Sequence, residues 1–410
     1  MTALELDAEP GEVGIDPLRL ERIDRHFERY VEDAKLPGFL VAVARGGQLC
    51  HVASAGNADV QDGTAIEPDT IFRIYSMTKP ITAVAALMLW EEGAFELKDP
   101  VSRLIPSFAD VRVFRSGSAV SPVTEPALEP IRMWHLFTHT AGLTYGFHHV
   151  HPVDAMYRTA GWEWGSPRNT DLAAACDQWA GMPLVNQPGT AFNYSVATDV
   201  LGRVVEVASG QPLDQFLQDR IFDPLGMDDT RFFVPDDQRH RLASLYVPTG
   251  PGRTIRRMNR TEDVKTSAPR YLSGGGGLMS SAADYLRFAD LLRRQGEVEG
   301  TRLLASRTVK YMTQNHLPGG VDLDQFGNRT FAETSFDGVG FGLGVSVVID
   351  PVKQKVPGSV GEFGWGGAAS TAFFVDPVED LVAVFLTQLL PSSTWPIRPQ
   401  LKQLLYQALA

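Results

Sequence analysis

The chain has 410 residues, of which 44% are hydrophobic and 21% are charged, a composition that is ordinary for a folded globular protein. Its net charge of −12 argues against nucleic acid or another polyanion as a partner, and no run of 18 or more apolar residues is present to span a membrane. Because a single hydrophobic core stops growing at about 250 to 300 residues, we expect two lobes.

Cysteine usage and the N-terminal residues bear on the compartment. The two cysteines, Cys50 and Cys176, are far apart and resemble neither a zinc-ligand pair nor a disulfide framework. So few cysteines fit a reducing compartment, and residues 1–17 lack the basic and apolar regions of a secretory signal. We therefore predict a cytoplasmic protein.

The first predicted elements are a helix and a hairpin. Asp16-Pro17 is typical of a helix start, and apolar residues recur after it at helical spacing, which predicts a helix that ends near residue 37. Residues 39–44 and 49–55 are apolar runs joined by a Gly-Gly pair, a sequence typical of a β-hairpin.

The middle of the chain is typical of helices and the last third is typical of strands. Helical stretches at 81–92, 198–209 and 282–294 alternate with loops that are rich in proline and glycine. Strand patterns return at 341–349, 368–375 and 381–388, and a helix at 399–409 closes the chain. Glycines alternate from Gly338 to Gly344, which predicts tight packing there.

Strands at both ends and helices between them predict the fold class. Two N-terminal and three C-terminal strands can pair into one antiparallel five-stranded sheet flanked by the terminal helices. This predicts an α/β domain built from residues 1–74 and 299–410, with a mainly helical domain, residues 75–298, inserted between its two parts. We expect the active site in the cleft between these domains.

Ser76-Met77-Thr78-Lys79 is a candidate for nucleophilic catalysis. Residues i and i+3 share one face of a helix, so the Ser76 hydroxyl and the Lys79 ammonium can come within hydrogen-bond reach. A serine hydroxyl needs a base that takes its proton, and a desolvated lysine can serve. Such a tetrapeptide often arises by chance as a capped helix, but the apolar run that follows makes a buried Lys79 costly without a role. Pro80 lacks an N–H for the Ser76 carbonyl, which predicts an irregular first turn.

With its neighbours, this tetrapeptide resembles the first motif of a known group, the class C β-lactamases, D-alanyl-D-alanine carboxypeptidases and family VIII esterases. The likeness spans most of the chain and is closest to the family VIII esterases. Further segments that resemble the group are residues 136–143, 188–190, 192–195, 224–227 and 274–278. The resemblance implies a β-lactamase and penicillin-binding-protein-like fold, with Ser76 as nucleophile and Lys79 as its activating partner.

The second motif of that group, Tyr-x-Asn, supplies a tyrosine that relays protons to and from the serine, and Tyr194 matches its position. A phenol beside a lysine ammonium is stabilised as phenolate and can act as a general base. Considered alone, Tyr194 would be an ordinary half-buried tyrosine, and the context favours the catalytic role. Val196 stands where the motif has asparagine, which argues against efficient β-lactam or peptide cleavage but not against ester cleavage.

The third motif, Lys-Thr-Gly in β-lactamases, is replaced by Trp365-Gly366-Gly367, which resembles the variant found in family VIII esterases. The resemblance implies that these three residues bind substrate, and the glycines would let the backbone approach a ligand closely. It also implies an oxyanion hole formed by the backbone N–H groups of Ser76 and Ala368. A glycine-rich turn with a packed tryptophan is the alternative interpretation.

Histidines provide the other candidates. His135 and His139 are four residues apart, a spacing that can chelate a metal, but no H-E-x-x-H sequence accompanies them and we predict no metal site. His148, His149 and His151 form a cluster that we expect to line a loop near the cleft or to be solvated. The sequence has no nucleophile elbow, phosphate loop or dinucleotide fingerprint, and we predict no cofactor.

These observations predict a serine esterase that hydrolyses carboxylic esters through an acyl-enzyme on Ser76, with a small-molecule ester as its partner. One alternative is a β-lactamase or D-alanyl-D-alanine carboxypeptidase, which Val196 and Trp365 disfavour, although weak β-lactam hydrolysis is compatible with the sequence. A second alternative is acyl transfer to an alcohol or amine in place of water. A third is a non-catalytic sensor, which the complete set of Ser76, Lys79 and Tyr194 disfavours.

Overall fold

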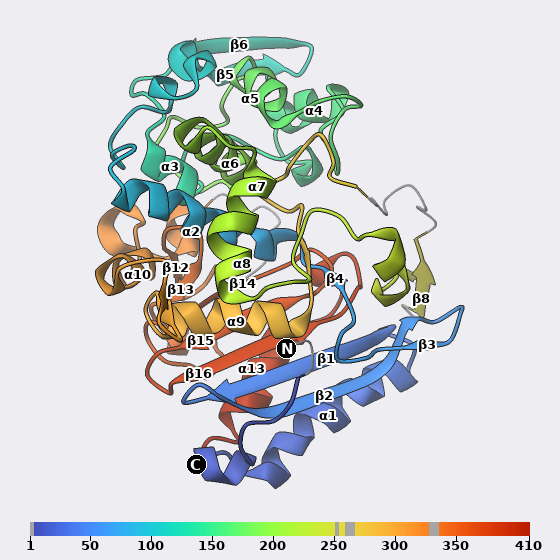
Figure 1. The fold of residues 1–410 in the computed structure, drawn as a ribbon. Coiled ribbons are helices and arrows are strands. Elements are labelled where there is room, and N and C mark those ends of the chain that lie inside the picture. Colours follow the sequence, from blue (N-terminus) through green and yellow to red (C-terminus); the bar gives the residue numbers. More distant parts are fainter. Residues whose placement is uncertain (1–3, 251–253, 259–266, 328–335) are drawn as a thin grey trace.

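A large antiparallel sheet with helices on both faces organises the structure, a computed structural model that describes residues 4–250, 254–258, 267–327 and 336–410. In Figure 1 the strands from the two ends of the chain, blue and red, lie together in the lower half of the view. The green helices from the middle of the chain lie above them. The arrangement agrees with the prediction that the two chain ends build one sheet.

The helices are α1 Pro17–Glu32, α2 Thr78–Glu91, α3 Met133–Phe137, α4 Pro152–Thr159, α5 Leu172–Ala180, α6 Ala197–Ser209, α7 Leu213–Leu217, α8 Asp223–Leu225, α9 Ala282–Arg293, α10 Ser306–Met312, α11 Leu323–Phe326, α12 Pro351–Gln354 and α13 Ile397–Tyr406. Two short 3-10 helices matter for the site, η2 Tyr75–Met77 and η5 Gly146–His148. Among the described residues, no helix has the length and apolar character that crossing a membrane requires.

The main sheet has eight antiparallel strands in the order β12-β13-β14-β15-β16-β1-β2-β3. Their bounds are β1 Gly38–Arg45, β2 Gln48–Asp59, β3 Thr64–Ala65, β12 Val339–Phe341, β13 Ser346–Val348, β14 Phe363–Gly366, β15 Ala372–Asp376 and β16 Leu381–Leu386. β1 and β16 pair from Leu40 opposite Leu386 to Arg45 opposite Leu381, and this pairing joins the two ends of the chain.

The predicted number of five strands is wrong, and three details explain the difference. The predicted strand 341–349 is a hairpin, because Gly344 has a φ of 92° and turns the chain between β12 and β13. β14 is a strand of its own, and β3 adds two residues at the other edge. A separate difference leaves the number of strands unchanged. The predicted strand 368–375 begins only at Ala372, because the Gly367 N–H donates to the Thr371 carbonyl at 3.0 Å and closes a turn.

The strands at the centre of the sheet are apolar throughout because both of their faces are buried. In β1, Leu40 and Ala42 belong to the core on the side of α2 and α9, whereas Phe39, Val41 and Val43 belong to the core formed with α1 and α13. This alternation follows from the period of two residues in a strand. The terminal helices therefore cover one face of the sheet, as predicted, and α9 packs against β1, β15 and β16 on the other.

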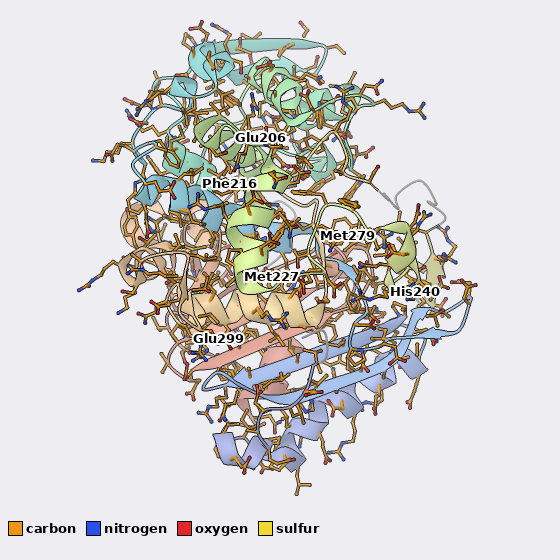
Figure 2. All side chains as sticks on the ribbon, in the orientation of Figure 1. Glu206, Phe216, Met227, His240, Met279 and Glu299 are labelled. Carbon is orange, nitrogen blue, oxygen red and sulfur yellow. The ribbon has the colours of Figure 1, made fainter. Side chains whose placement is uncertain are left out.

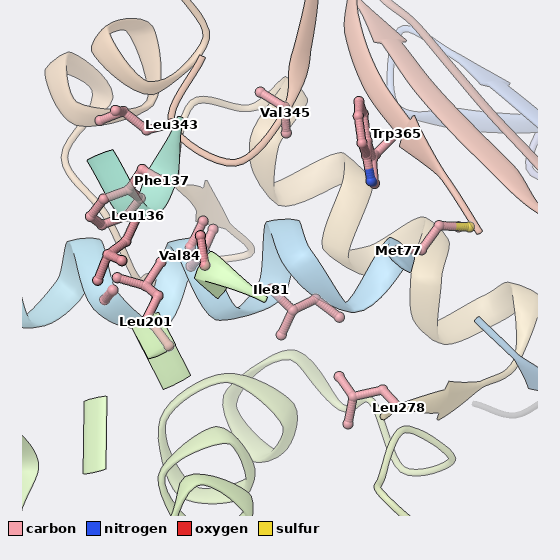
Figure 3. Close-up of a cluster of buried hydrophobic side chains, with 14 of the residues drawn as sticks. Met77, Ile81, Val84, Leu136, Phe137, Leu201, Leu278, Leu343, Val345 and Trp365 are labelled. Carbon is pink, nitrogen blue, oxygen red and sulfur yellow. The ribbon is translucent and has the colours of Figure 1, made fainter. Parts of the chain in front are cut away.

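Helix α2 lies at the centre of the helical part. Its residues from Thr78 to Leu89 are all buried, and α6 packs along it. Figure 3 shows Val84 of α2 beside Leu136 of α3 and Leu201 of α6. Phe216 and Met227, labelled in Figure 2, belong to the same core.

The glycine-rich edge of the sheet meets this helix at close range. A Cβ at Gly344 would lie 2.5 Å from the Ala83 Cβ of α2, and one at Gly340 would lie 2.4 Å from the Asn315 side chain. The tight packing predicted from the alternating glycines is therefore confirmed.

The segment predicted to be mainly helical, residues 75–298, also contains strands. β5 Arg112–Ser118 and β6 Ser121–Pro126 form a hairpin, and the others are β7 Tyr246–Thr249, β8 Thr254–Arg257, β9 Met279–Ser280 and β10 Glu297–Val298. α9 belongs to this segment by sequence but packs on the sheet. The division into two domains with these boundaries stays a prediction.

Candidate active site

Ser76 lies in η2, directly before α2. Tyr75, the preceding residue, has a φ of 44°. This value lies in the left-handed region, which is unfavourable in free energy for any residue that has a side chain. The Tyr285 hydroxyl of α9 donates a hydrogen bond to the Met77 carbonyl at 2.8 Å and so ties this turn to a neighbouring helix. The irregular first turn predicted from Pro80 is confirmed, because the chain forms a 3-10 turn before the α-helix begins.

The three residues predicted to act in catalysis lie together. The Tyr194 hydroxyl donates to Ser76 Oγ at 2.7 Å, and Lys79 Nζ donates to the same oxygen at 3.3 Å. Lys79 Nζ also lies 4.5 Å from the centre of the Tyr194 ring. Ser76 is 8% exposed, and Lys79 and Tyr194 are each 1% exposed. Because little water reaches Lys79 and Tyr194, a charge on one of them acts strongly on the other.

Two further groups bind the Lys79 ammonium, and the sequence did not single out their roles. Lys79 Nζ donates to the Gly275 carbonyl at 2.8 Å and to the Tyr145 hydroxyl at 3.1 Å. Together with Ser76 Oγ, these oxygens supply an acceptor for each N–H of an ammonium group. Val196, at the position where the resembled motif has asparagine, is buried and apolar and contributes no acceptor side chain.

Gly275 is itself positioned by a buried carboxylate. Asp199 Oδ1 accepts hydrogen bonds from the Ser273 hydroxyl at 2.6 Å, the Tyr271 hydroxyl at 2.9 Å and the Gly275 N–H at 3.1 Å. Burial and then the Asp199 charge raise the pKa of Tyr271 well above its usual value, so its hydroxyl remains a donor. A Cβ on Gly275 would lie 2.5 Å from Asp199 Oδ2, which explains the need for glycine in this segment.

Tyr194 stands before the start of α6, and two histidines contact it. His148 Nε2 donates to the Tyr194 carbonyl at 2.6 Å, and the His139 and Tyr194 ring centres are 4.8 Å apart. Burial and then the charge of Lys79 lower the pKa of His139 well below its usual value, and burial lowers the pKa of His148. Both rings are therefore neutral at pH 7 and add no positive charge beside Tyr194.

The other histidines make separate contacts. His149 lies at the surface 3.2 Å from Glu163, and His151 is the N-cap of α4. His135 Nδ1 accepts from the Arg132 N–H at 2.9 Å. In the parts of the chain that the structure describes, no three His, Cys, Asp or Glu side chains converge as metal ligands.

Trp365, on β14, contacts Tyr194 from the sheet. Its Nε1 donates to the Tyr194 hydroxyl at 3.4 Å, and it is 3% exposed. Figure 3 shows the Trp365 side chain pointing from the sheet toward the start of α2, where Met77 lies. The third predicted segment therefore reaches the same place as Ser76, Lys79 and Tyr194.

Gly366 and Gly367 allow two close approaches at the end of β14. A Cβ on Gly366 would lie 2.4 Å from the Arg398 guanidinium, and a Cβ on Gly367 would lie 2.4 Å from the Ile74 carbonyl oxygen. Both contacts are with other parts of this chain, so packing alone requires these glycines. The second contact brings the end of β14 against the backbone just before Ser76.

Ala368 follows in the turn after β14. Arg398 Nη2 donates to the Gly367 carbonyl at 2.8 Å and to the Thr371 carbonyl at 3.1 Å, which clamps both ends of this turn. The oxyanion role of the Ser76 and Ala368 N–H groups stays a prediction. The same holds for the substrate-binding role of residues 365–367.

The sheet, the inserted helices and the Ser-Lys-Tyr cluster define a protein with the fold of β-lactamases and penicillin-binding proteins. The Beta-lactamase family matches residues 23–407, and the chain belongs to this family. Because the match covers nearly the whole chain, it includes every residue of the site described above.

Individual relatives are similar over nearly their full lengths. Protein Rv1367c of Mycobacterium tuberculosis is 37% identical over 360 residues, which are 87% of this chain and 86% of that protein. Esterase EstB of Burkholderia gladioli is 32% identical over 406 residues, with 94% of each chain covered. The solved structure of EstCE1, a hydrolase with promiscuous acyltransferase activity, superposes with a TM-score of 0.80 and 26% identity, covering 96% of this chain and 99% of that one.

Sequence reasoning missed Tyr145, Asp199 and Arg398 as parts of this site. Tyr145 follows the segment 136–143 by two residues, and Asp199 lies in the first turn of α6, five residues after Tyr194. Both residues lie close in sequence to segments that resemble the family, and this closeness was the one sign in the sequence that they could belong to the site. Arg398 lies outside all of those segments, and only its contact with Gly366 and Gly367 reveals it.

Proposed function

We propose that this protein is a serine esterase that hydrolyses small carboxylic esters through a covalent acyl-enzyme on Ser76. The observation that carries the proposal is the contact of Ser76 Oγ with the Tyr194 hydroxyl at 2.7 Å and with Lys79 Nζ at 3.3 Å. A serine hydroxyl in contact with two groups that exchange protons meets the requirement for an activated nucleophile. The similarity to Esterase EstB supports an ester as the substrate.

In the proposed acylation, the Tyr194 hydroxyl has first lost its proton to solvent, and the phenolate oxygen beside the Lys79 ammonium then accepts the hydrogen bond from Ser76 Oγ. Ser76 Oγ gives its proton to Tyr194 and bonds to the ester carbonyl carbon. The carbonyl oxygen becomes an oxyanion, which the N–H groups of Ser76 and Ala368 stabilise. The bond from that carbon to the alcohol oxygen then breaks, and the leaving alcohol takes the proton from Tyr194.

Deacylation repeats these steps with water. Water gives a proton to Tyr194 and bonds to the acyl carbon, and collapse of this second intermediate releases the carboxylic acid. Ser76 Oγ recovers its proton from Tyr194. The ester and one water are thereby converted to an acid and an alcohol, and the enzyme is restored.

The direct test removes the Ser76 hydroxyl. Ser76→Ala should lower turnover of a short-chain aryl ester, such as p-nitrophenyl butyrate, by about 10³-fold or more, because no acyl-enzyme can form. Ser118→Ala, at an exposed position in β5, is the matched control and should keep full activity. Mass spectrometry of the parent enzyme, quenched during turnover, should find the acyl group on Ser76. Parent-level turnover by Ser76→Ala would refute the proposal.

Acyl transfer is the second candidate, favoured by the likeness to EstCE1, a hydrolase with promiscuous acyltransferase activity. An alcohol would attack the same acyl-enzyme in place of water and give its proton to Tyr194. Adding an alcohol during ester turnover and measuring the ratio of new ester to free acid decides between the two. If the ratio of new ester to free acid stays at zero over a wide range of alcohol concentrations, the enzyme catalyses hydrolysis and not acyl transfer.

Weak β-lactam hydrolysis is a proposed side activity, which membership of the Beta-lactamase family supports. Val196 and Trp365 replace an amide and a cation, respectively, so we expect any such rate to be far below the esterase rate. The decay of cephalosporin absorbance, with Ser76→Ala as the blank, measures it.

A further inference from the structure

Three aromatic rings stack in sequence from the Lys79 ammonium toward the surface. Lys79 Nζ lies 5.4 Å from the Tyr145 ring centre. The Tyr145 and Phe147 ring centres are 4.6 Å apart, and the Phe147 and Trp164 ring centres are 4.5 Å apart. The planes differ by only 20° and 13°, so the rings are nearly parallel. We call Tyr145, Phe147 and Trp164 the aromatic ladder.

The outer end of the aromatic ladder is open to solvent. Trp164 is 56% exposed, and Tyr145 and Phe147 are half-buried. Large exposed aromatic side chains next to a reactive centre are typical of a surface that binds something apolar. His149 and Glu163, which neighbour the ladder in sequence, contact each other at 3.2 Å.

The backbone holds the ladder in place. A Cβ on Gly146, between two of its residues, would lie 2.4 Å from the Trp162 carbonyl oxygen, and Arg158 Nη1 donates to the Gly146 carbonyl. His148, which directly follows Phe147, donates to the Tyr194 carbonyl at 2.6 Å. The segment that carries the inner two rings is therefore tied to the catalytic tyrosine and is formed before any substrate binds.

The proposed acyl-enzyme chemistry assigns the ladder to one side of the ester. The oxyanion points to the N–H groups of Ser76 and Ala368, whereas the leaving alcohol must face Tyr194, which returns the proton. The Tyr145 hydroxyl lies 3.1 Å from Lys79 Nζ, and the ring centres of Tyr145 and Tyr194 are 5.4 Å apart. The ladder thus begins on the side from which the alcohol oxygen takes its proton.

We propose that the aromatic ladder is the alcohol subsite, and that it selects esters with an apolar, aryl-type alcohol part. The proposal rests on the esterase function proposed above. An aryl group against Trp164 and Phe147 would remove apolar ring surface from water on both partners. In acyl transfer the acceptor alcohol occupies the same subsite, gives its proton to Tyr194 and bonds to the acyl carbon, which releases Ser76.

The test compares two acetate esters that form the same acetyl-enzyme, 2-naphthyl acetate and methyl acetate. In Trp164→Ala, kcat/KM should fall by about tenfold for the naphthyl ester and by less than about twofold for the methyl ester. The rate of acetyl-enzyme hydrolysis, measured by single turnover, should not change, because the alcohol has left by then. Trp164→Phe, which keeps a ring, should recover most of the loss. Leu128→Ala, at a side chain that is 82% exposed elsewhere, is the control.

Two results would overturn the proposal. An equal fall in kcat/KM for both esters would mean that Trp164 acts on the acyl side or only on stability. A changed rate of acetyl-enzyme hydrolysis would place the ladder on the acyl side. Failure of the esterase proposal is distinguishable, because then neither ester would acylate Ser76 in the parent enzyme.

A second measurement uses acceptor alcohols. If the ladder binds the alcohol, 2-phenylethanol should divert more of the acetyl-enzyme to a new ester than ethanol does at equal concentration. Trp164→Ala should remove that preference. Equal diversion by both alcohols in the parent enzyme would contradict the alcohol subsite.

Discussion

Lys79 depends on contacts with residues that are distant in sequence. Its ammonium binds the Tyr145 hydroxyl, 66 residues later, and the Gly275 carbonyl, 196 residues later. The Gly275 carbonyl is held because Asp199 binds the N–H of the same residue. Asp199 is therefore a positioning residue, which acts on the proposed catalytic lysine through Gly275.

We expect Asp199→Ala to lower kcat for a short aryl ester by about tenfold to 100-fold, with KM changed by less than about threefold. The substitution removes the acceptor of the Ser273 and Tyr271 hydroxyls and of the Gly275 N–H, so the carbonyl that binds Lys79 shifts. Steady-state kinetics across a pH series measure the effect.

Two variants qualify that prediction. Asp199→Asn keeps an oxygen in place and should recover part of the lost kcat, whereas Asp177→Ala, at an exposed position of α5, should have no effect. If Asp199→Ala lowers only the melting temperature and leaves kcat and the pH profile unchanged, the role of Asp199 is structural.

At the scale of elements, α13 and β14 act together. Arg398 of α13 clamps the turn after β14, and Lys402 of the same helix pairs with Glu362, just before β14, at 2.7 Å. Lys402 and Glu362 are both buried, so loss of either partner would leave an unpaired buried charge. Both ends of the strand that carries Trp365 are thus tied to the C-terminal helix.

Gly367→Ala tests the approach of β14 to η2. The added methyl group would lie 2.4 Å from the Ile74 carbonyl oxygen, so the turn carrying Ala368 must move away from Ser76. We expect kcat/KM to fall by about 100-fold and the free energy of unfolding to fall by about 1–3 kcal/mol. Gly11→Ala, where a Cβ meets no atom within 4 Å, is the matched control. Full activity in Gly367→Ala would argue against an oxyanion hole at this turn.

At the scale of the whole molecule, buried titratable groups link stability to pH in two directions. Burial, then the Arg132 charge, lowers the pKa of His135 from 6.5 to about 4, and burial raises the pKa of Asp284 from 3.8 to about 6. His135 is more easily protonated in the unfolded chain, so its contribution to stability is lost as the pH falls below 6.5. The Asp284 contribution is present at low pH and is lost as the pH rises through about 6.

His135→Asn separates these opposing contributions. Relative to pH 7, the parent protein should lose about 2–3 kcal/mol at pH 4.5 through His135 alone, because its pKa lies near 4 when folded and 6.5 when unfolded. The amide of the variant does not titrate. Between pH 7 and pH 4.5 the variant should therefore lose about 2–3 kcal/mol less free energy of unfolding than the parent does. Urea unfolding at both pH values measures the difference. His240→Asn, at an exposed ring, should follow the parent, and identical curves for His135→Asn and the parent would refute the assignment.

The fold was largely predictable because its strongest signals are local. The apolar runs of β1 and β16 and the helical spacing of α1 are readable from neighbouring residues. The number of strands was not predictable in this way. Whether residues 341–349 form one strand or a hairpin depends on the turn at Gly344, which packs against Ala83 of α2.

The site was predictable only in part. The meeting of Ser76 and Lys79 follows from positions i and i+3, and it is observed at 3.3 Å. Tyr194 was identified through a family resemblance, because it lies 118 positions after Ser76 and no local signal indicates their contact. Asp199 and Tyr145 were missed for the same reason, since their partners are far away along the chain.

The sequence by itself determined that strands from both ends of this chain could pair, that Ser76 and Lys79 share a face, and that the chain resembles β-lactamase-like serine hydrolases. Those properties depend on neighbours or on matched motifs. Only the tertiary structure decided which oxygens bind the Lys79 ammonium and that an aromatic ladder extends from it to the surface. Such contacts join residues from separate loops and helices, and no local pattern specifies them, because they exist only once packing has brought those segments together.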